Sequence, residues 1–196
     1  MLAKPACARS EFILGGQKSG KSRRAESLAL DWLTRSPAHR AVLIATARPG
    51  DAEMRERIAR HQSDRAERAP GLHVVEEPVQ LAEALAAHSR PHILVVVDCL
   101  TLWLTNLLMP VDSYASNRPF ALDALAPIAT LLIALEQARG PVVLVGNEIG
   151  LGVIPLGPGT RAFVDALGRL NQDVAQTCER VTFLAAGLPL ALKGQP

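Results

Sequence analysis

The chain has 196 residues and a mass of 21.0 kDa, a size typical of one folded domain. Hydrophobic residues make up 48% of it and charged residues 20%, a composition that excludes disorder throughout the chain. The 21 basic and 19 acidic residues leave a net charge of +2, and aromatic residues make up 4%. These values argue against a general nucleic-acid binder and against a base-stacking surface.

No uninterrupted apolar run reaches the length of about 18 residues that a membrane span needs. The best candidate, Ile93–Met109, contains a carboxylate, two hydroxyl side chains and an amide, so we expect a buried strand followed by a helix there. The three cysteines are scattered and odd in number, which fits neither a disulfide framework nor a zinc site. Residues 1–10 lack the apolar core of a signal peptide. We therefore expect a cytoplasmic protein with a loose tail over residues 1–10.

Six apolar stretches have the composition of strands. They are Glu11–Gly15, Ala41–Thr46, Leu72–Glu76, Ile93–Asp98, Val142–Asn147 and Val181–Ala185. Several are continuous runs rich in β-branched residues, a pattern that predicts strands buried on both faces of a parallel sheet.

Helical patterns alternate with these strands. They cover Lys21–Arg35, Asp51–Arg68, Gln80–His88, Leu100–Met109, Leu122–Arg139 and Arg161–Cys178. Such alternation predicts an α/β fold with right-handed crossovers. The clearest long loop, Pro110–Pro119, is expected to act as a lid or a subunit contact. Because no linker divides the chain, we expect residues 11–196 to form one domain.

The first predicted strand ends in a match to the phosphate-loop pattern G-x-x-x-x-G-K-[ST], and a predicted helix begins there. The residues of the match are Gly15, Gly16, Gln17, Lys18, Ser19, Gly20, Lys21 and Ser22. Glycines let backbone amides wrap around phosphate oxygens at a helix N-terminus. Lys21 can then reach the β- and γ-phosphates, and the Ser22 hydroxyl can ligate Mg²⁺. An ordinary glycine-rich turn with a solvated lysine is the alternative, and the strand–helix context favours nucleotide binding.

The loop and the alternation together predict a P-loop NTPase-like (RecA-like) α/β domain with a mostly parallel central sheet flanked by helices. Asp98 ends another predicted strand, where a phosphate-loop enzyme usually has a second Mg²⁺ partner. It can also cap the following helix, a role that Asp favours, and we prefer the metal role. Thr46, Glu76 and Asn147 end further strands, so all of these residues are expected at the carboxyl edge of the sheet, where ligands bind.

A basic helix carries the histidine of most interest. Arg57, His61, Asp64, Arg65 and Arg68 recur at helical spacing within Asp51–Arg68 and share one face. An imidazole among arginines suits an anionic ligand. A solvated polar face is the alternative, and the pattern by itself favours that alternative.

Five stretches together have a specific resemblance. They are ILGGQKSGKSRRAE (Ile13–Glu26), LIATARPGDAEMRERIARH (Leu43–His61), VVVDCLTLWLTNLL (Val95–Leu108), VVLVGNEIGLGVIP (Val142–Pro155) and the end of the chain. The last stretch includes Arg161, Asp165, Gly168, Asn171, Gln172 and GLPLALK (Gly187–Lys193). With them the chain resembles, over nearly its whole length, the bifunctional adenosylcobinamide kinase / adenosylcobinamide-phosphate guanylyltransferase family of cobalamin biosynthesis.

The resemblance implies two reactions, with GTP and ATP as nucleotide substrates. The phosphate loop and the end of the Ile93–Asp98 strand predict Mg²⁺ as cofactor, held by Ser22 and Asp98. Adenosylcobinamide is phosphorylated, and GMP is then transferred from GTP to adenosylcobinamide phosphate through a covalent GMP–histidine intermediate, which the motif E-M-x-x-R-I-x-x-H assigns to His61. The resemblance also implies a homotrimer. From the composition and the lack of a long apolar run, we expect neither nucleic acid nor a membrane as partner. Further nucleotide contacts map to Thr46, Ala47, Arg48, Gln62, Ser63, Asp64, Arg65, Glu76 and Asp98.

Three other functions remain open from the sequence. One is a phosphate-loop small-molecule kinase with no covalent step, and another is a nucleotide-dependent binding or switch protein. The third is a guanylyltransferase that has lost the kinase activity. For guanylyl transfer, Arg57 and Arg65 are our candidates for stabilising charge on the equatorial phosphate oxygens.

Overall fold

A computed structural model describes residues 8–50, 52–109, 124–153 and 156–194 of the chain. Most of the predicted tail and the whole Pro110–Pro119 loop therefore lie outside the described residues. Six side chains of one helix also lie outside the description. They are Glu53, Met54, Arg57, His61, Asp64 and Ala66.

The described residues form a seven-stranded sheet in the order β3-β2-β4-β5-β1-β6-β7. In chain order the strands are β1 (Ser10–Gly15), β2 (Arg40–Ala45), β3 (Leu72–Glu76), β4 (Ile93–Asp98), β5 (Val142–Asn147), β6 (Arg180–Ala185) and β7 (Leu188–Lys193). Every neighbouring pair is parallel except β6 and β7, which are antiparallel. The predicted α/β fold with a mostly parallel sheet is thus confirmed.

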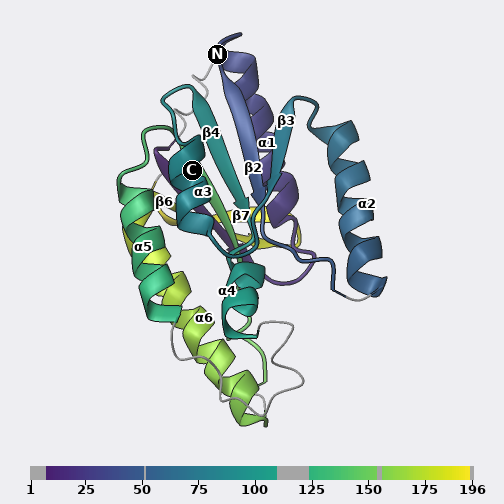
Figure 1. The fold of residues 1–196 in the computed structure, drawn as a ribbon, viewed down its shortest axis with the longest axis vertical. Coiled ribbons are helices and arrows are strands. Elements are labelled where there is room, and N and C mark those ends of the chain that lie inside the picture. Colours follow the sequence, from purple (N-terminus) through teal and green to yellow (C-terminus); the bar gives the residue numbers. More distant parts are fainter. Residues whose placement is uncertain (1–7, 51, 110–123, 154–155, 195–196) are drawn as a thin grey trace.

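Helices cover both faces of this sheet (Figure 1). They are α1 (Lys21–Arg35), α2 (Ala52–Arg68), α3 (Leu81–His88), α4 (Leu100–Leu108), α5 (Leu125–Glu136) and α6 (Pro158–Thr177). Phe12 and Leu14 of β1 pack into the core shared with α3, α4, α5 and α6, while Ile13 packs into the core on the α1 side. This alternation within one strand explains why the sequence of β1 is apolar without interruption. Helix α2 stands beside β3, at the edge of the sheet (Figure 1).

The sequence-based prediction missed strand β7, although it placed the other six strands to within one residue of their observed ends. A two-residue turn, Ala186–Gly187, joins β6 to β7, and both turn residues have positive φ, 51° and 80°. Positive φ at both positions is the geometry of a type I′ hairpin turn, which sequences usually signal with Asn-Gly or Asp-Gly. Because alanine stands at the first position, the usual hairpin signal is missing from this sequence.

The start of α6 and the end of α5 each differ from the prediction by three residues. Helix α6 begins at Pro158 rather than Arg161, because proline suits the first turn of a helix, where no amide hydrogen bond is lost. Helix α5 ends at Glu136, short of Arg139. Among the described helices, none combines the length and the apolar composition that crossing a membrane requires.

The core packing of α5 generates a stability prediction. Leu131 is fully buried, whereas Ile133 on the same helix is 52% exposed. Leu131→Ala should lower the free energy of unfolding by about 2–5 kcal/mol, because it removes buried methyl groups and leaves a cavity. Ile133→Ala should cost less than about 1 kcal/mol. Chemical denaturation of the two variants measures both values, and equal losses would contradict the assignment of the buried face.

Candidate phosphate and nucleotide site

The phosphate loop lies at the carboxyl end of β1, between the ends of two neighbouring strands. Gly15, the last residue of β1, is in register with Asn147 of β5 and Leu184 of β6. A Cβ atom at Gly15 would lie 2.4 Å from the Leu184 carbonyl oxygen and 2.6 Å from Oγ of Ser19. Gly20, the N-cap of α1, has a left-handed backbone with φ of 100°, which favours glycine. Two glycines of the motif are thus required by the shape of the turn itself.

Lys21 is the buried cation of the loop, with 7% of its surface exposed. Its Nζ donates to the Gly16 carbonyl oxygen at 2.5 Å and lies 3.4 Å from Oγ of Ser19. Burial lowers the pKa of the Lys21 ammonium below its ordinary value, and the neighbouring Cys99 and Asp98 oppose this shift. An ammonium that has lost much of its hydration is well suited to an anionic ligand.

Backbone hydrogen bonds hold the loop from two sides. The Glu148 amide donates to the Gly15 carbonyl oxygen at 3.1 Å, and the Gly187 amide donates to the Ser19 carbonyl oxygen at 3.0 Å. Gly187 belongs to the hairpin turn that the sequence analysis missed, and its Cα lies 3.5 Å from the position of a Cβ at Gly20. The β6–β7 hairpin therefore contacts the phosphate loop at Ser19 and Gly20 and holds it in place.

Asp98 lies on β4, close enough to the loop to influence Lys21 electrostatically. It is the last residue of the strand, and Cys99 is the N-cap of α4. The alternative role of Asp98 as the helix cap is therefore wrong, because the strand extends through Asp98 and the N-cap position falls on Cys99.

The oxygen donors of Asp98 and Ser22 fit a magnesium ion. Ser22 is half-buried in the first turn of α1, directly after Lys21. Within the described part of the chain, no group of three or more His, Cys, Asp or Glu side chains is arranged as a metal cage. Mg²⁺ typically uses one or two protein oxygens together with substrate phosphates and water, so a serine and one carboxylate are the donor set expected beside a nucleotide.

Thr46 follows β2 directly, and all its polar groups are engaged within the protein. Its hydroxyl donates to the Cys99 carbonyl oxygen at 2.7 Å and accepts from the Cys99 amide at 2.9 Å. Its amide donates to the Asp98 carbonyl oxygen at 3.1 Å, and its carbonyl accepts from Nδ2 of Asn106 at 2.7 Å. Thr46 is fully buried, so in this structure it positions the Asp98–Cys99 segment. The next residues, Ala47 and Arg48, are partly exposed.

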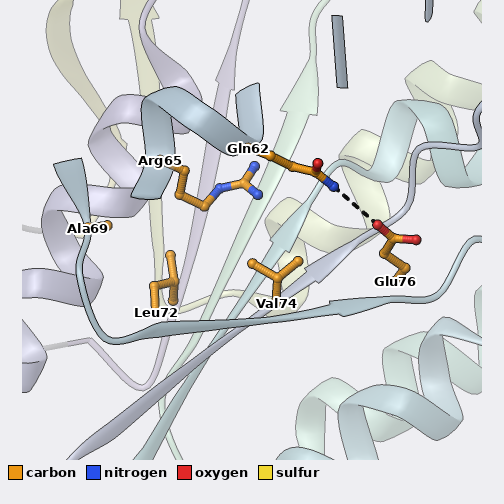
Figure 2. Close-up of a pocket in the computed structure, with 6 residues that line it drawn as sticks. All are labelled: Gln62, Arg65, Ala69, Leu72, Val74 and Glu76. Atoms are coloured by element: carbon orange, nitrogen blue, oxygen red, sulfur yellow. Dashed lines mark hydrogen bonds between the residues drawn. The ribbon is translucent and has the colours of Figure 1, made fainter. Parts of the chain in front are cut away.

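A cavity of about 340 Å³ lies between α2 and β3 (Figure 2). Its lining residues are Gln62, Arg65, Ala69, Leu72, Val74 and Glu76. Nε2 of Gln62 donates to Oε1 of Glu76 at 3.3 Å. Ser63 on the same helix is exposed. The cavity thus combines an apolar floor from β3 with a guanidinium, an amide and a carboxylate, groups that can recognise a polar ligand.

The structure gathers the predicted site residues into two groups. The phosphate loop and Asp98 form one group, whereas Gln62, Arg65 and Glu76 form the other around the cavity. Strands β5, β4 and β2 separate β1 from β3, a separation of about 19 Å at the usual spacing of strands. His61 precedes Gln62 on α2, but its side chain lies outside the description, as do those of Arg57 and Asp64.

Comparison with known proteins assigns the family. The model of the cobinamide kinase / cobinamide phosphate guanyltransferase family matches residues 11–192. The chain belongs to this family. It is accordingly a bifunctional enzyme of cobalamin biosynthesis, a transferase with kinase and nucleotidyltransferase activities.

Curated relatives agree with the family over almost their full length. The bifunctional adenosylcobalamin biosynthesis protein CobP of Pseudomonas aeruginosa is 46% identical, over 95% of this chain and 98% of the relative. CobU of Escherichia coli is 32% identical, over 93% of this chain and 98% of the relative. CobU of Salmonella typhimurium is 31% identical over the same shares.

A solved structure supports the fold independently of the family. The crystal structure of the flagellar accessory protein FlaH from Methanocaldococcus jannaschii matches with a TM-score of 0.53, over 98% of this chain and 82% of that chain. The sequence identity is 10%, so the match concerns the α/β fold and not the chemistry of the family.

Sequence reasoning missed Gly187 and Glu26. Nothing in the sequence indicates a role for Gly187, because only the β6–β7 hairpin brings it to the phosphate loop. Glu26 lies beside Ala25 and Ala29 on the buried face of α1, so an acidic residue within an apolar helix face was the available signal. A carboxylate in such a position needs cationic partners, and the structure supplies them from α2.

The buried position of Lys21 generates a binding prediction. Lys21→Ala should weaken the binding of GTP at least tenfold, or about 1.4 kcal/mol, because it removes the cation that is held within the loop. Equilibrium titration of the protein with a fluorescent GTP analogue measures this loss. Lys18→Ala, which removes an exposed lysine of the same loop, should weaken binding much less. Equal losses in the two variants would contradict the assignment of Lys21.

Proposed function

We propose that the enzyme phosphorylates adenosylcobinamide with ATP or GTP, and then transfers GMP from GTP to adenosylcobinamide phosphate through a covalent intermediate on His61. The products of the second reaction are adenosylcobinamide-GDP and pyrophosphate. The observation that carries the proposal is a phosphate loop with a buried lysine, at the end of β1, in a chain of this family. We propose that residues 11–196 act as one catalytic unit.

In the kinase reaction, the hydroxyl oxygen of the substrate forms a bond to the γ-phosphorus of the nucleotide, and the bond from that phosphorus to the bridging oxygen breaks. The hydroxyl proton is lost, and the nucleoside diphosphate leaves. Lys21 and the loop amides hold the phosphate oxygens in place and offset their charge. Ser22 and Asp98 would hold Mg²⁺, which supplies further charge neutralisation when bound.

In guanylyl transfer, a ring nitrogen of His61 forms a bond to the α-phosphorus of GTP, and the α–β bridging bond breaks to release pyrophosphate. A phosphate oxygen of adenosylcobinamide phosphate then attacks the phosphorus of the adduct, and the N–P bond breaks to return the imidazole. The covalent step divides a displacement between two anions into two easier displacements. Arg65 lines the cavity and follows His61 by about one turn of α2, which supports a role in stabilising the transferred phosphoryl group.

The nucleotide contacts that the family resemblance implies are consistent with the two groups of residues. We propose that residues 15–22 and Asp98 bind phosphates and that Gln62–Arg65 and Glu76 contact GTP at the cavity under α2. Thr46, Ala47 and Arg48 lie between the two groups in the sheet, at the end of β2. Thr46 would act there through the Asp98–Cys99 segment, to which it is hydrogen-bonded.

The covalent step is tested with GTP labelled at the α-phosphate. Wild-type protein incubated with it and Mg²⁺ should retain protein-bound label after denaturation, and the label should be labile in acid and stable in alkali. His61→Ala should lose this label and guanylyl transfer, yet keep part of the kinase activity, because the phosphate loop is intact. His88→Ala, which removes a histidine from α3, should keep the label.

Two outcomes would contradict the division of labour between His61 and the loop. Equal loss of both activities in His61→Ala would show that the histidine is not specific to guanylyl transfer. Absence of label in wild-type protein that binds GTP would favour a kinase without a covalent step, or a nucleotide-dependent switch.

We further propose that the enzyme works in the cytoplasm as a homotrimer. Leu188 and Leu190 alternate along β7, so both lie on one face of this edge strand. Leu192 follows them at the register shift between Ala191 and Lys193. Each of them is more than half exposed. An edge strand with an exposed apolar row is a typical site for association with another chain.

The trimer proposal is tested by the mass in solution. Light scattering should give about 63 kDa, three times the chain mass of 21.0 kDa. Leu190→Asp should shift the mass toward the monomer, because it places a charge in the apolar row. Leu125→Asp on α5, at another exposed leucine, serves as the matched control. A monomeric wild-type protein would overturn the proposal.

A further inference from the structure

Glu26 is a buried carboxylate on the helix that begins at the phosphate loop. Its exposed fraction is 3%, and it lies on α1, whose first residue is Lys21. Ser22 precedes Glu26 by four positions, so the two residues share one face of α1. The carboxylate of Asp98 also influences Glu26 electrostatically. Glu26 is therefore rigidly connected to the phosphate loop through little more than one helical turn.

Both ionic partners of Glu26 come from α2. Nε of Arg65 lies 3.6 Å from Oε1 of Glu26, and Nε of Arg68 lies 3.2 Å from Oε2. Burial raises the pKa of the Glu26 carboxyl above its ordinary value, although Arg68 and Arg65 oppose this shift. A carboxylate so deeply desolvated needs its cationic partners, and these two pairs attach α2 to α1.

Few of the other described side chains of α2 are buried against the molecule. Among the side chains of α2 that the structure describes, Arg65 is buried, Ile58 is half-buried and the others are exposed. The cavity beneath the helix separates it from β3 (Figure 2). Among the described side chains of α2, the contacts with the rest of the molecule are thus mainly polar: the ion pairs of Arg65 and Arg68 with Glu26 and the hydrogen bond of Gln62 to Glu76.

We infer that Glu26 is a positioning residue for guanylyl transfer, which through Arg65 and Arg68 sets the place of α2 relative to the phosphate loop. His61 precedes Arg65 by four residues on α2, or about one helical turn. A fixed position of Arg65 therefore fixes the part of the helix that carries His61. The same contact orients the guanidinium of Arg65 at the cavity. This inference rests on the proposed role of His61 as the nucleophile.

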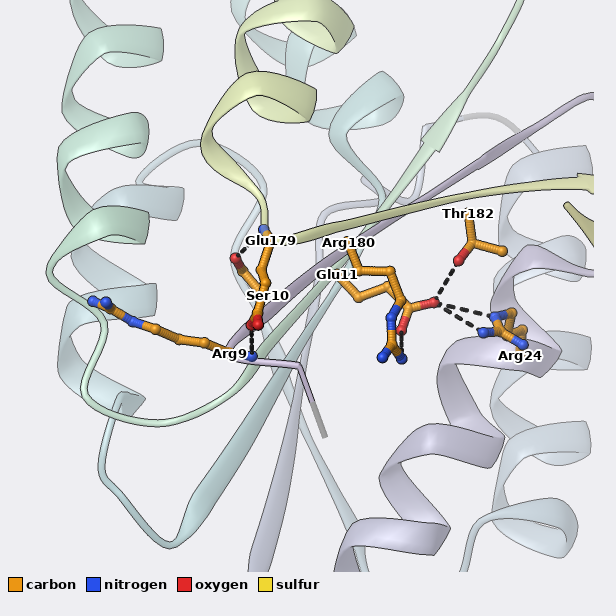
Figure 3. A network of polar contacts seen from close by, with 7 residues as sticks. All are labelled: Arg9, Ser10, Glu11, Arg24, Glu179, Arg180 and Thr182. Atoms are coloured by element: carbon orange, nitrogen blue, oxygen red, sulfur yellow. Dashed lines mark hydrogen bonds and ion pairs between the residues drawn. The ribbon is translucent and has the colours of Figure 1, made fainter. Parts of the chain in front are cut away.

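A purely structural role for Glu26 is the competing explanation, and the chain contains a matched control for it. Glu11 on β1 is also 3% exposed, and it also pairs with two arginines, Arg24 at 3.1 Å and Arg180 at 3.4 Å. Figure 3 shows these partners together with Thr182, which donates to Glu11 at 2.9 Å. None of these partners belongs to α2, so Glu11→Gln removes an equivalent buried carboxylate without touching that helix.

The experiment compares Glu26→Gln and Glu11→Gln in three measurements on the full chain. These are the urea midpoint of unfolding, the single-turnover rate of labelling by α-labelled GTP at saturating nucleotide, and the steady-state kinase rate. Both variants should unfold at lower urea concentration. Glu26→Gln should slow labelling at least tenfold while its kinase rate stays within about threefold of wild type. Glu11→Gln should change labelling and kinase rates by similar small factors.

A second variant keeps the test decisive if Glu26→Gln does not fold. Arg68→Gln breaks one of the two pairs from the α2 side, at a side chain that is 39% exposed. It should slow labelling in the same direction by a smaller factor, again with the kinase rate preserved.

The outcomes separate this inference from the proposed function. Labelling that falls only in proportion to the kinase rate, or equally in both glutamine variants, overturns the role of Glu26. Unchanged labelling in Glu26→Gln overturns it as well. If wild-type protein takes up no label, or if His61→Ala takes up as much as wild type, the proposed chemistry of His61 fails instead.

Discussion

Strand β1 is hydrogen-bonded to β5 along one edge and to β6 along the other, and its side chains are buried on both faces of the sheet. Its backbone groups are used within the sheet until the strand ends at Gly15. The loop that follows is therefore the first part of this segment whose amides can turn to a ligand. Lys21 sits inside that loop, where low polarity strengthens its attraction for phosphate. Without the neighbouring strands, the same eight residues would have no fixed shape around an anion.

Helix α1 connects the phosphate loop to the rest of the site. Its first turn contains Lys21 and Ser22, and its next turn contains Glu26, which holds Arg65 and Arg68 of α2. The two groups of site residues thus share one rigid element, although three strands separate β1 from β3. Glu26 is therefore the described residue through which α1 contacts the buried guanidinium of α2.

Local patterns were sufficient to predict most of the fold. The β-branched runs predicted six strands, because a strand buried on both faces requires apolar residues at every position. They did not predict β7, whose leucines alternate and are exposed, and whose turn begins with an alanine. Strand β7 forms because its backbone pairs with the free edge of β6. No residue of β7 indicates from the sequence that this edge is available.

The candidate site also has a part that the sequence predicts and a part that only the tertiary structure decides. The phosphate loop is a contiguous motif, so it could be identified from the sequence alone, and its Gly15 and Gly20 are required by the shape of the turn. The ordered family stretches identify the enzyme. The support of Ser19 by Gly187 and the pairing of Glu26 with Arg65 join residues far apart in the chain. Such contacts depend on the order of the strands in the sheet and on the packing of the helices against one another. Only the tertiary structure decides that arrangement, because burial and charge pairing act between residues that are close in space and not in sequence.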